Sequence, residues 1–371
     1  MKICNDILKL SVLFIFFTLL PTKSNGQWSA IGNTTPAFHV SSFAFQDNIY
    51  FAGGLRSLTG ANDKIEIYNV VTGTLTAKTI SVPRGGIMTA MLNGKIYFAG
   101  GYKFLGKPTS AEFYSIIDIF DTASNTWTTA NLSTPRAYGA ISVVNGKLLI
   151  AGGFTNVSEQ IAPSNIVDIY NSTTGEWTVE KLTVSRGLLS GVSFGNKTYF
   201  CGGITDLATG QSSNRVDVYN ASNNTWSIDS ISLSRGATSI VGIDKYIIVA
   251  GGYNNASGAL DNVDIFDTEL NKWTTTRLSQ PRSFMASAAH GQKAYFTGGG
   301  NNNTTSRFLS SSSNQVDIFD VKTGIWTTNS LVNSRVAHTC ISLNNNIYVG
   351  GGFQPEKRNM TGVIETLKTN Q

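Results

Sequence analysis

Few side chains in this sequence have the chemistry that catalysis or metal binding requires. The chain has three histidines, His39, His290 and His338. Imidazoles are common metal ligands and general bases, so two histidines brought together could begin a metal site. No carboxylate or thiolate stands at a spacing that completes a ligand set, and no Ser-His-Asp arrangement or phosphate-binding loop can be recognised. We therefore predict no metal and no cofactor. The question of an enzyme stays open, with a non-catalytic protein favoured.

Six arginines occupy one repeated position, and an acidic residue recurs at another. The arginines are Arg84, Arg136, Arg186, Arg235, Arg282 and Arg335, with Ala37 in the first unit. The acids are Glu66, Asp118, Asp168, Asp217, Asp264, Asp317 and Glu365. A ring of arginines could bind an acidic ligand. Because both series recur together, we favour structural ion pairs over a binding site.

Two further series divide the chain into units of about 50 residues. Glycine doublets occupy Gly53 and Gly54, Gly100 and Gly101, Gly152 and Gly153, Gly202 and Gly203, Gly251 and Gly252, Gly298 and Gly299, and Gly351 and Gly352. A bulky residue stands 25 positions before each doublet: Trp28, Leu75, Trp127, Trp177, Trp226, Trp273 and Trp326. Strand-forming units repeated at this period are typical of a β-propeller. We expect the bulky residues to pack between units and the glycines to allow positive φ or close backbone approach.

One unit shows how the strands are arranged. The segments 136–144, 148–153 and 166–171 and the residues around Trp177 are rich in β-branched and aromatic residues. Asn145-Gly146 between the first two segments is a strong signal for a hairpin turn. The sequence therefore predicts an all-β, seven-bladed propeller of four-stranded antiparallel blades. The strand at Trp28 would complete the last blade by pairing with residues 364–368, which closes the ring and removes its free edges. Closure would also make His39 and His338 neighbours.

The first 26 residues are predicted to be a secretory signal peptide, and residues 27–371 to form the propeller. Lys2 and Lys9 precede a short apolar run at residues 10–20. Without this leader, the 28 basic and 23 acidic residues become 25 and 22, a net charge of +3. No basic stripe suggests a nucleic acid partner, and no second apolar run suggests a membrane span. We expect a secreted, extracellular monomer.

The remaining cysteines and the Asn-x-Ser/Thr sequences bear on modification. Cys201 and Cys340 would lie in blades well apart, so we expect no disulfide. Eleven asparagines precede x-Ser/Thr, and we expect a glycoprotein if the source glycosylates secreted proteins: Asn33, Asn131, Asn156, Asn171, Asn196, Asn220, Asn223, Asn255, Asn302, Asn303 and Asn359.

The units resemble kelch repeats. The resemblance rests on the glycine doublet, a Tyr or Phe 15–21 residues later, and a Trp seven residues beyond it, and it covers residues 28–371. It implies a propeller that usually binds other proteins through one face. In a minority of relatives, such as galactose oxidase or bacterial sialic-acid epimerases, the propeller is an enzyme. An oxidase of the first kind needs a cysteine joined to a tyrosine, whereas Cys201 and Cys340 lie inside regular repeat strands.

Loop length indicates which face binds. All length variation falls between the doublet and the next aromatic, in the connection from the second to the third strand. Variable loops on a rigid repeat usually carry binding. The resemblance to peptide-binding kelch proteins adds the residues after the doublets and after the arginines. The candidate ligand-binding residues are His39, Tyr102, Tyr138, Phe154, Tyr253, Phe284, His338 and Phe353.

An aromatic-lined mouth of this kind suits a peptide or a sugar ring. Some of these side chains could instead only fill the interface between blades. We therefore expect a non-catalytic module that binds an extracellular protein segment or glycan. The alternative is a carbohydrate-active enzyme on the same scaffold, such as a sialic-acid epimerase or mutarotase. An isolated acid, arginine or histidine at the axis would favour the enzyme.

Overall fold

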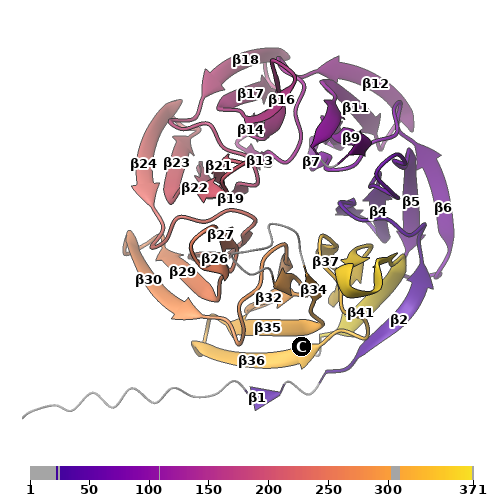
Figure 1. Ribbon diagram of the computed structural model, residues 1–371, viewed down its shortest axis with the longest axis vertical. Coiled ribbons are helices and arrows are strands. Elements are labelled where there is room, and N and C mark those ends of the chain that lie inside the picture. Colours follow the sequence, from indigo (N-terminus) through magenta and orange to yellow (C-terminus); the bar gives the residue numbers. More distant parts are fainter. Residues whose placement is uncertain (1–21, 24–25, 108, 302–309, 370–371) are drawn as a thin grey trace, which may run out of the picture.

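The four-stranded unit expected from the sequence occurs seven times around a central axis in the computed structural model (Figure 1). The structure describes residues 22–23, 26–107, 109–301 and 310–369. Most of the predicted leader, and the asparagines at positions 302 and 303, lie outside the described residues. In this part of the chain, no helix is long and apolar enough to cross a membrane.

Each blade is an antiparallel meander whose first strand lies nearest the axis and whose fourth strand lies outermost (Figure 1). The first four blades consist of β3 (Ser41–Phe45), β4 (Asn48–Ala52), β5 (Lys64–Asn69) and β6 (Leu75–Thr79); β7 (Met88–Leu92), β8 (Lys95–Ala99), β11 (Ile116–Asp121) and β12 (Thr126–Asn131); β13 (Ala140–Val144), β14 (Lys147–Ala151), β17 (Ile166–Asn171) and β18 (Glu176–Lys181); and β19 (Ser190–Phe194), β20 (Lys197–Cys201), β23 (Arg215–Asn220) and β24 (Thr225–Ser230).

The last three blades follow the same order. They consist of β25 (Ser239–Ile243), β26 (Tyr246–Ala250), β29 (Asn262–Asp267) and β30 (Lys272–Arg277); β31 (Ala286–His290), β32 (Lys293–Thr297), β35 (Gln315–Asp320) and β36 (Ile325–Ser330); and β37 (Thr339–Leu343), β38 (Asn346–Gly350), β41 (Val363–Lys368) and β2 (Trp28–Asn33).

The N-terminal strand closes the ring as predicted. Strand β2 pairs antiparallel with β41, with Trp28 opposite Leu367 and a register shift between Ala30 and Gly32. The last blade is thus completed by residues from both ends of the propeller. An additional short strand, β1 (Thr22–Lys23), runs parallel to the outer edge of β36. The sequence analysis assigned these two residues to the leader and predicted no strand there.

Local sequence explains the turns. Asn145 and Gly146 have φ values of 45° and 70°, which a type I′ hairpin requires at both central positions. The doublet residues Gly152 and Gly153 have φ values of 63° and 106°. A Cβ on either would lie 2.6 Å from a backbone oxygen of a neighbouring segment. Both reasons expected for glycine at the doublet are therefore present.

The recurrent aromatic residues pack within and between blades, as expected. Trp127 lies 4.9 Å from the ring of Phe120 in its own blade, measured between centroids, and joins a cluster with the apolar strands of the first blade. The indole Nε1 of Trp273 donates a 2.8 Å hydrogen bond to Asp229 on the outer strand of the preceding blade. Leu75, which replaces Trp in one unit, is exposed.

The six repeated arginines are structural, as favoured from the sequence. Each is completely or almost completely buried and pairs with the repeated acid of its own unit. Arg84, for example, binds Asp118 at 2.7 Å and donates to the carbonyls of Gly100 and Phe98. In the first unit, where alanine replaces arginine, Glu66 instead accepts hydrogen bonds from the backbone and hydroxyl of Thr35.

The two described cysteines are free. Cys201 is buried in β20 and Cys340 is half-buried in β37. Burial raises the pKa of each thiol to about 12. Both therefore remain protonated at neutral pH and are poor nucleophiles.

Candidate functional site

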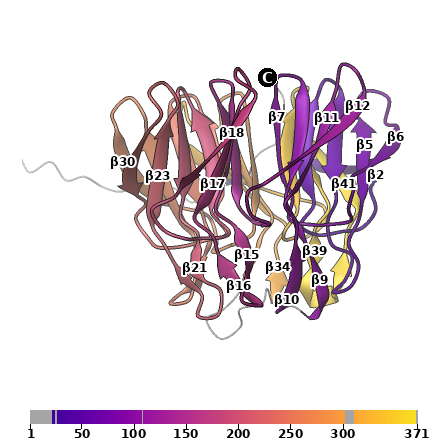
Figure 2. The ribbon, with the colours of Figure 1, turned by 90° about the horizontal axis from the view of Figure 1, so that it is seen from above.

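The variable connections fold into short hairpins that project from one face of the ring (Figure 2). We call this side the loop face. The sequence analysis placed the length variation here but predicted no strands in it. The hairpins are β9 (Tyr102–Lys107) with β10 (Ser110–Phe113), β15 (Phe154–Val157) with β16 (Gln160–Pro163), β21 (Ile204–Asp206) with β22 (Gln211–Ser212), β27 (Tyr253–Asn254) with β28 (Gly258–Ala259), β33 (Gly300–Asn301) with β34 (Ser311–Ser312), and β39 (Phe353–Gln354) with β40 (Asn359–Met360). A single 3₁₀ turn at Pro355–Lys357 separates the last two strands.

One residue from each blade forms a ring around the axis just before the innermost strand. We call this ring the collar; its members are His39, Gly86, Tyr138, Leu188, Ala237, Phe284 and Ala337. All seven have φ between 50° and 62°. Six of the seven neighbouring pairs are joined by backbone N–H to carbonyl bonds of 2.9–3.2 Å.

The collar combines a uniform backbone with varied side chains. A left-handed conformation costs a non-glycine residue about 1–3 kcal/mol and persists only where the surrounding structure enforces it. Here the six backbone hydrogen bonds between neighbouring blades hold the collar residues in this conformation. The residue type at each position is therefore not dictated by the local backbone. Imidazole, phenol, phenyl, isobutyl and methyl groups all occur in equivalent places around one mouth.

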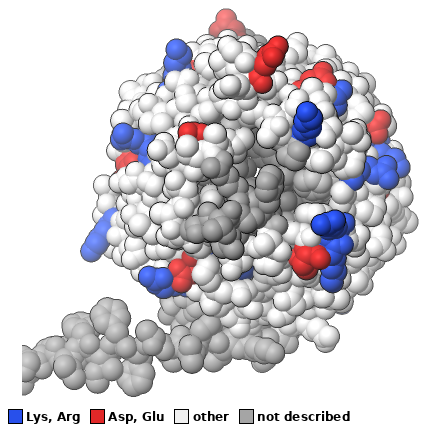
Figure 3. All heavy atoms as spheres, viewed as in Figure 1, with Lys and Arg blue, Asp and Glu red and all other residues white. Residues whose placement is uncertain are grey.

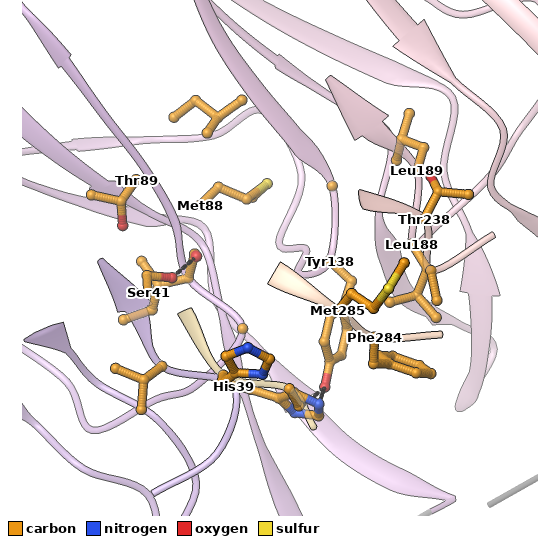
Figure 4. A pocket seen from close by; sticks show the side chains of 18 residues that line it. His39, Ser41, Met88, Thr89, Tyr138, Leu188, Leu189, Thr238, Phe284 and Met285 are labelled. Atoms are coloured by element: carbon orange, nitrogen blue, oxygen red, sulfur yellow. Dashed lines mark hydrogen bonds between the residues drawn. The ribbon is translucent and has the colours of Figure 1, made fainter. Parts of the chain in front are cut away.

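Cavities lie on both sides of the collar. The loop-side cavity has a volume of about 450 Å³, and the channel cavity along the innermost strands has about 330 Å³. Figure 4 shows the channel cavity, where Tyr138 and Phe284 extend from different parts of the ring toward its centre. A smaller pocket of about 100 Å³ adjoins both, since it shares Leu188 and Phe284 with them.

All eight candidate residues line one of these adjoining cavities. His39, Tyr138 and Phe284 belong to both larger cavities. Tyr102, Phe154 and Phe353 line only the loop-side cavity; Tyr253 lines the small pocket, and His338 lines the channel cavity.

Several of these side chains also pack between hairpins, which was the other interpretation left open. Tyr102, Phe154 and Tyr253 are 2%, 3% and 8% exposed, and the latter two pack against Ile204. They therefore form the wall of the cavities more than a freely exposed surface.

The sequence analysis missed part of the wall. Four residues of the hairpins line the loop-side cavity: Phe104, Phe113, Ile161 and Met360. Leu188, a collar residue, lines all three cavities. Its position relative to the repeated arginine is the same as that of Tyr138 and Phe284, so that spacing could have identified it.

Three polar side chains from three blades meet at the base of the loop-side cavity. The hydroxyl of Tyr138 is hydrogen-bonded to Nδ1 of His39 (Figure 4) and to the hydroxyl of Tyr102. The Tyr102 hydroxyl lies 3.2 Å from the same Nδ1. We call these residues the polar cluster. The His39 and Tyr138 rings are perpendicular, with centroids 5.0 Å apart.

Burial keeps the polar cluster uncharged. It lowers the pKa of His39 to about 3 and raises the pKa of both Tyr102 and Tyr138 above the ordinary tyrosine value. Charged forms are disfavoured because the apolar wall cannot solvate them. At neutral pH the cluster therefore consists of a neutral imidazole and two neutral phenols.

The described residues around the mouth also include no charged side chain in the cavity lining. No described residue that lines the three cavities is an aspartate, glutamate, lysine or arginine. Figure 3 shows the loop face with its acidic and basic side chains mainly toward the periphery. Exposed apolar side chains instead lie in the loop-face connections of the first four blades, at Leu58, Leu105, Val157 and Leu207. We call these four residues the apolar crown.

The two histidines expected to become neighbours do lie in adjoining blades, since the His39 N–H donates to the carbonyl of Ala337. Their side chains have different partners: His338 Nε2 lies 2.9 Å from the Thr297 hydroxyl, whereas His39 contacts the phenols. Within the described ranges, no group of three or more His, Cys, Asp or Glu residues could hold a metal ion. The third histidine, His290, lies at the far end of β31 and contacts Ser342.

Comparison with known proteins agrees with this architecture. The family model described as Attractin/LZTR1 beta-propeller matches residues 96–360, more than half of the chain. A solved structure described as "Structure of YjhT" is similar at a TM-score of 0.60 and 18% sequence identity, covering 76% of this chain and 94% of the other. A search of curated proteins found no match. The chain belongs to the Attractin/LZTR1 β-propeller family.

Proposed function

We propose that this member of the Attractin/LZTR1 β-propeller family is a non-catalytic module that binds a segment of another protein on its loop face. An apolar or aromatic side chain of that segment would occupy the loop-side cavity. The observation that carries the proposal is this cavity of about 450 Å³, which has an aromatic wall and no charged residue among its described lining. Its volume is in the range typical of ligand sites.

The apolar crown favours a protein over a glycan. Leu58 and Leu207 line the cavity and are still 42% and 41% exposed, and Leu105 and Val157 are more exposed. Clustered exposed apolar side chains commonly mark protein interaction sites. A glycan would bring many hydroxyl groups that need polar partners. The described polar side chains of this cavity are only the polar cluster and Ser57.

The alternative of a carbohydrate-active enzyme depends on His39, the histidine at the collar. A general base works best with a pKa near the operating pH. Burial lowers the pKa of His39 to about 3, which makes it a weak base at neutral pH. An acidic sugar would also need a cation, and all six repeated arginines are buried in ion pairs. These features support binding over catalysis.

We also propose that the protein is secreted as a monomeric glycoprotein once the leader is removed. The support is the sequence pattern of the leader and the position of the acceptor asparagines. Seven of the nine described acceptors are exposed: Asn33, Asn131, Asn156, Asn196, Asn223, Asn255 and Asn359. Expression in a secreting eukaryotic cell, followed by N-terminal sequencing and glycopeptide mass spectrometry, would test both parts. A retained leader would contradict the first part.

Selection from a displayed library of random peptides tests the binding proposal directly. The bait is the secreted protein, and the counter-bait carries Tyr138→Ala and Phe284→Ala. Two collar positions already hold alanine, so the ring tolerates both changes. We expect enriched peptides to carry an aromatic or large apolar residue. Their affinity should fall by at least about 2 kcal/mol on the double variant, as for interface hot spots.

The matched control is Val179→Ala, an exposed position on the outer strand β18. Calorimetry on single peptides should show unchanged affinity for this variant, and melting curves should show that all variants are folded. Enriched peptides that bind the double variant as well as the wild type would contradict the proposed site. Binding to a glycan array with no enriched peptide would contradict the protein partner.

A further inference from the structure

We propose that the loop-side cavity selects a tyrosine side chain as the anchor of the bound segment, because the polar cluster offers one donor and one acceptor to a phenol hydroxyl. This inference rests on the proposed function and specifies the chemistry of its ligand. It follows from the hydrogen-bonding capacity of three residues that lie far apart in the sequence: His39, Tyr102 and Tyr138.

The arrangement of the cluster limits which hydrogen bonds can coexist. Nδ1 of His39 is in contact with both hydroxyls, and the two hydroxyls are in contact with each other. The other ring nitrogen, Nε2, is 3.4 Å from the Tyr138 hydroxyl, too far for a good bond. One ring nitrogen can accept or donate a hydrogen bond, but it cannot do both. The three contacts therefore cannot all be hydrogen bonds at once.

Counting protons shows what remains unpaired within the cluster. If His39 carries its proton on Nε2, Tyr138 donates to Nδ1 and Tyr102 donates to Tyr138. This leaves the Nε2–H as a donor and the Tyr102 oxygen as an acceptor. If the proton is on Nδ1, the Nδ1–H group donates a hydrogen bond to the Tyr138 hydroxyl, and Tyr138 donates one to Tyr102. This leaves the Tyr102 O–H as a donor and Nε2 as an acceptor. Either tautomer presents one donor and one acceptor, from two residues that both line the loop-side cavity.

A hydroxyl group matches this pair because it donates and accepts through one atom. The aromatic wall, with Phe104, Phe113 and Phe154, adds a preference for a ring beneath the hydroxyl. A phenylalanine or leucine would displace water from the cluster without replacing its hydrogen bonds, which weakens binding. A carboxylate or phosphate would lose its hydration, and no cation stands among the described lining residues to compensate. A tyrosine side chain therefore matches both the aromatic wall of the cavity and the polar cluster at its bottom.

Methionine methyl groups can report on binding without a known partner. Met360 lines the loop-side cavity, Met88 and Met285 line the channel cavity, and Met91 lies on β7 outside the lining of both. In protein labelled with ¹³C-methyl methionine, we would titrate N-acetyl-tyrosinamide, N-acetyl-phenylalaninamide and N-acetyl-O-methyltyrosinamide. We expect the tyrosine probe to shift Met360 and to bind about tenfold more tightly than the other two, the effect of about one buried hydrogen bond.

Variants separate recognition of the hydroxyl from a general loss of structure. His39→Ala introduces a residue already present in the equivalent positions Ala237 and Ala337, so the collar should form. This variant and Tyr102→Phe each remove one of the two groups that the cluster offers to a ligand, so both should lose the preference for tyrosine over phenylalanine while still binding the phenylalanine probe. The matched control is His290→Ala at the far end of β31, which should keep the tenfold preference.

The outcomes distinguish the inference from the proposed function. Equal binding of the tyrosine and phenylalanine probes at Met360 would overturn the inference and leave an apolar binding site. No shift of Met360 with any probe would count against both. Methyl galactoside shifting Met360 where the amides do not would overturn the inference in favour of a glycan. A preference unchanged by His39→Ala would also overturn it.

Discussion

The neutral state of His39 can be tested through the dependence of folding on pH. Burial lowers the pKa of this imidazole to about 3 in the folded protein, from 6.5 for an ordinary histidine. A histidine with a lowered pKa stabilises the fold most above its ordinary pKa. That stabilisation is lost as the pH falls from 6.5 toward 3, because the imidazole then binds a proton in the unfolded chain but not in the folded chain. We therefore expect wild-type protein to lose stability in this range partly through His39.

The size of the effect follows from linkage. At pH 5 the histidine is almost fully protonated in the unfolded chain and neutral in the folded one, which costs about 2 kcal/mol. At pH 7.5 the cost is close to zero. Because pH 5 lies well above the folded pKa, the expected value is nearly the same for any folded pKa below about 4. His39→Ala removes this contribution while losing the same hydrogen bonds at both pH values.

The measurement compares how much His39→Ala destabilises the fold at two pH values. Urea unfolding of wild type and His39→Ala, followed by tryptophan fluorescence at pH 7.5 and pH 5, gives the destabilisation by the variant at each pH. We expect this destabilisation to be about 2 kcal/mol smaller at pH 5. The other acid-sensitive groups are present in both proteins and cancel, including His338, whose pKa burial also lowers.

The NMR resonance of His39 provides a direct control for its protonation state. The chain has three histidines, so ¹³Cε1 resonances can be assigned with one variant each. The His39 resonance should not titrate between pH 7.5 and pH 5. If His39→Ala destabilises the fold equally at both pH values, or if the His39 resonance titrates near 6.5, the conclusion that His39 stays neutral in the folded protein is refuted.

The remaining predictions concern the scaffold. Deleting residues 27–35 should abolish cooperative unfolding, because it removes the strand that closes the ring; a truncated protein that melts like the full one would contradict this. Cys201 and Cys340 should react with iodoacetamide only after denaturation, since burial raises both thiol pKa values to about 12; mass spectrometry of native and denatured protein tests this, and rapid native alkylation would show that they are accessible. Arg186→Met should cost about 3–5 kcal/mol by leaving Asp217 buried without its cation, and adding Asp217→Asn should restore part of this loss in chemical denaturation; equal stability of the single and double variants would argue against the pair.

The repetitive part of the structure was predictable because each unit repeats the same local requirements. The Asn145-Gly146 turn needs positive φ at both residues, and the glycine doublets need positive φ and close backbone approach. Both requirements are met by the residue type itself and can be recognised in a sequence. Ring closure followed because the strand at Trp28 and the last strand each lacked a partner.

The hairpins and the polar cluster were less accessible to sequence reasoning. The hairpin β15–β16 lies in a connection whose length differs between units, so the repeat gives no register for it. His39, Tyr102 and Tyr138 come from different blades and meet only because the ring brings the collar and one hairpin together. Their types and positions suggested an aromatic mouth. The hydrogen bonds among them, and the lowered histidine pKa, depend on contacts over 36–99 residues.

Gly86 shows how a small change in one blade builds a site on a symmetric scaffold. It occupies the collar position at which all six other blades carry a residue with a Cβ. A Cβ at Gly86 would lie 3.1 Å from the ring of Tyr102 and 3.6 Å from that of Tyr138. The missing side chain therefore leaves the space in which the two phenols meet. The collar backbone accepts many residue types at this position. The arrangement of large and absent side chains around the whole collar therefore determines where the cavity lies and what it can bind.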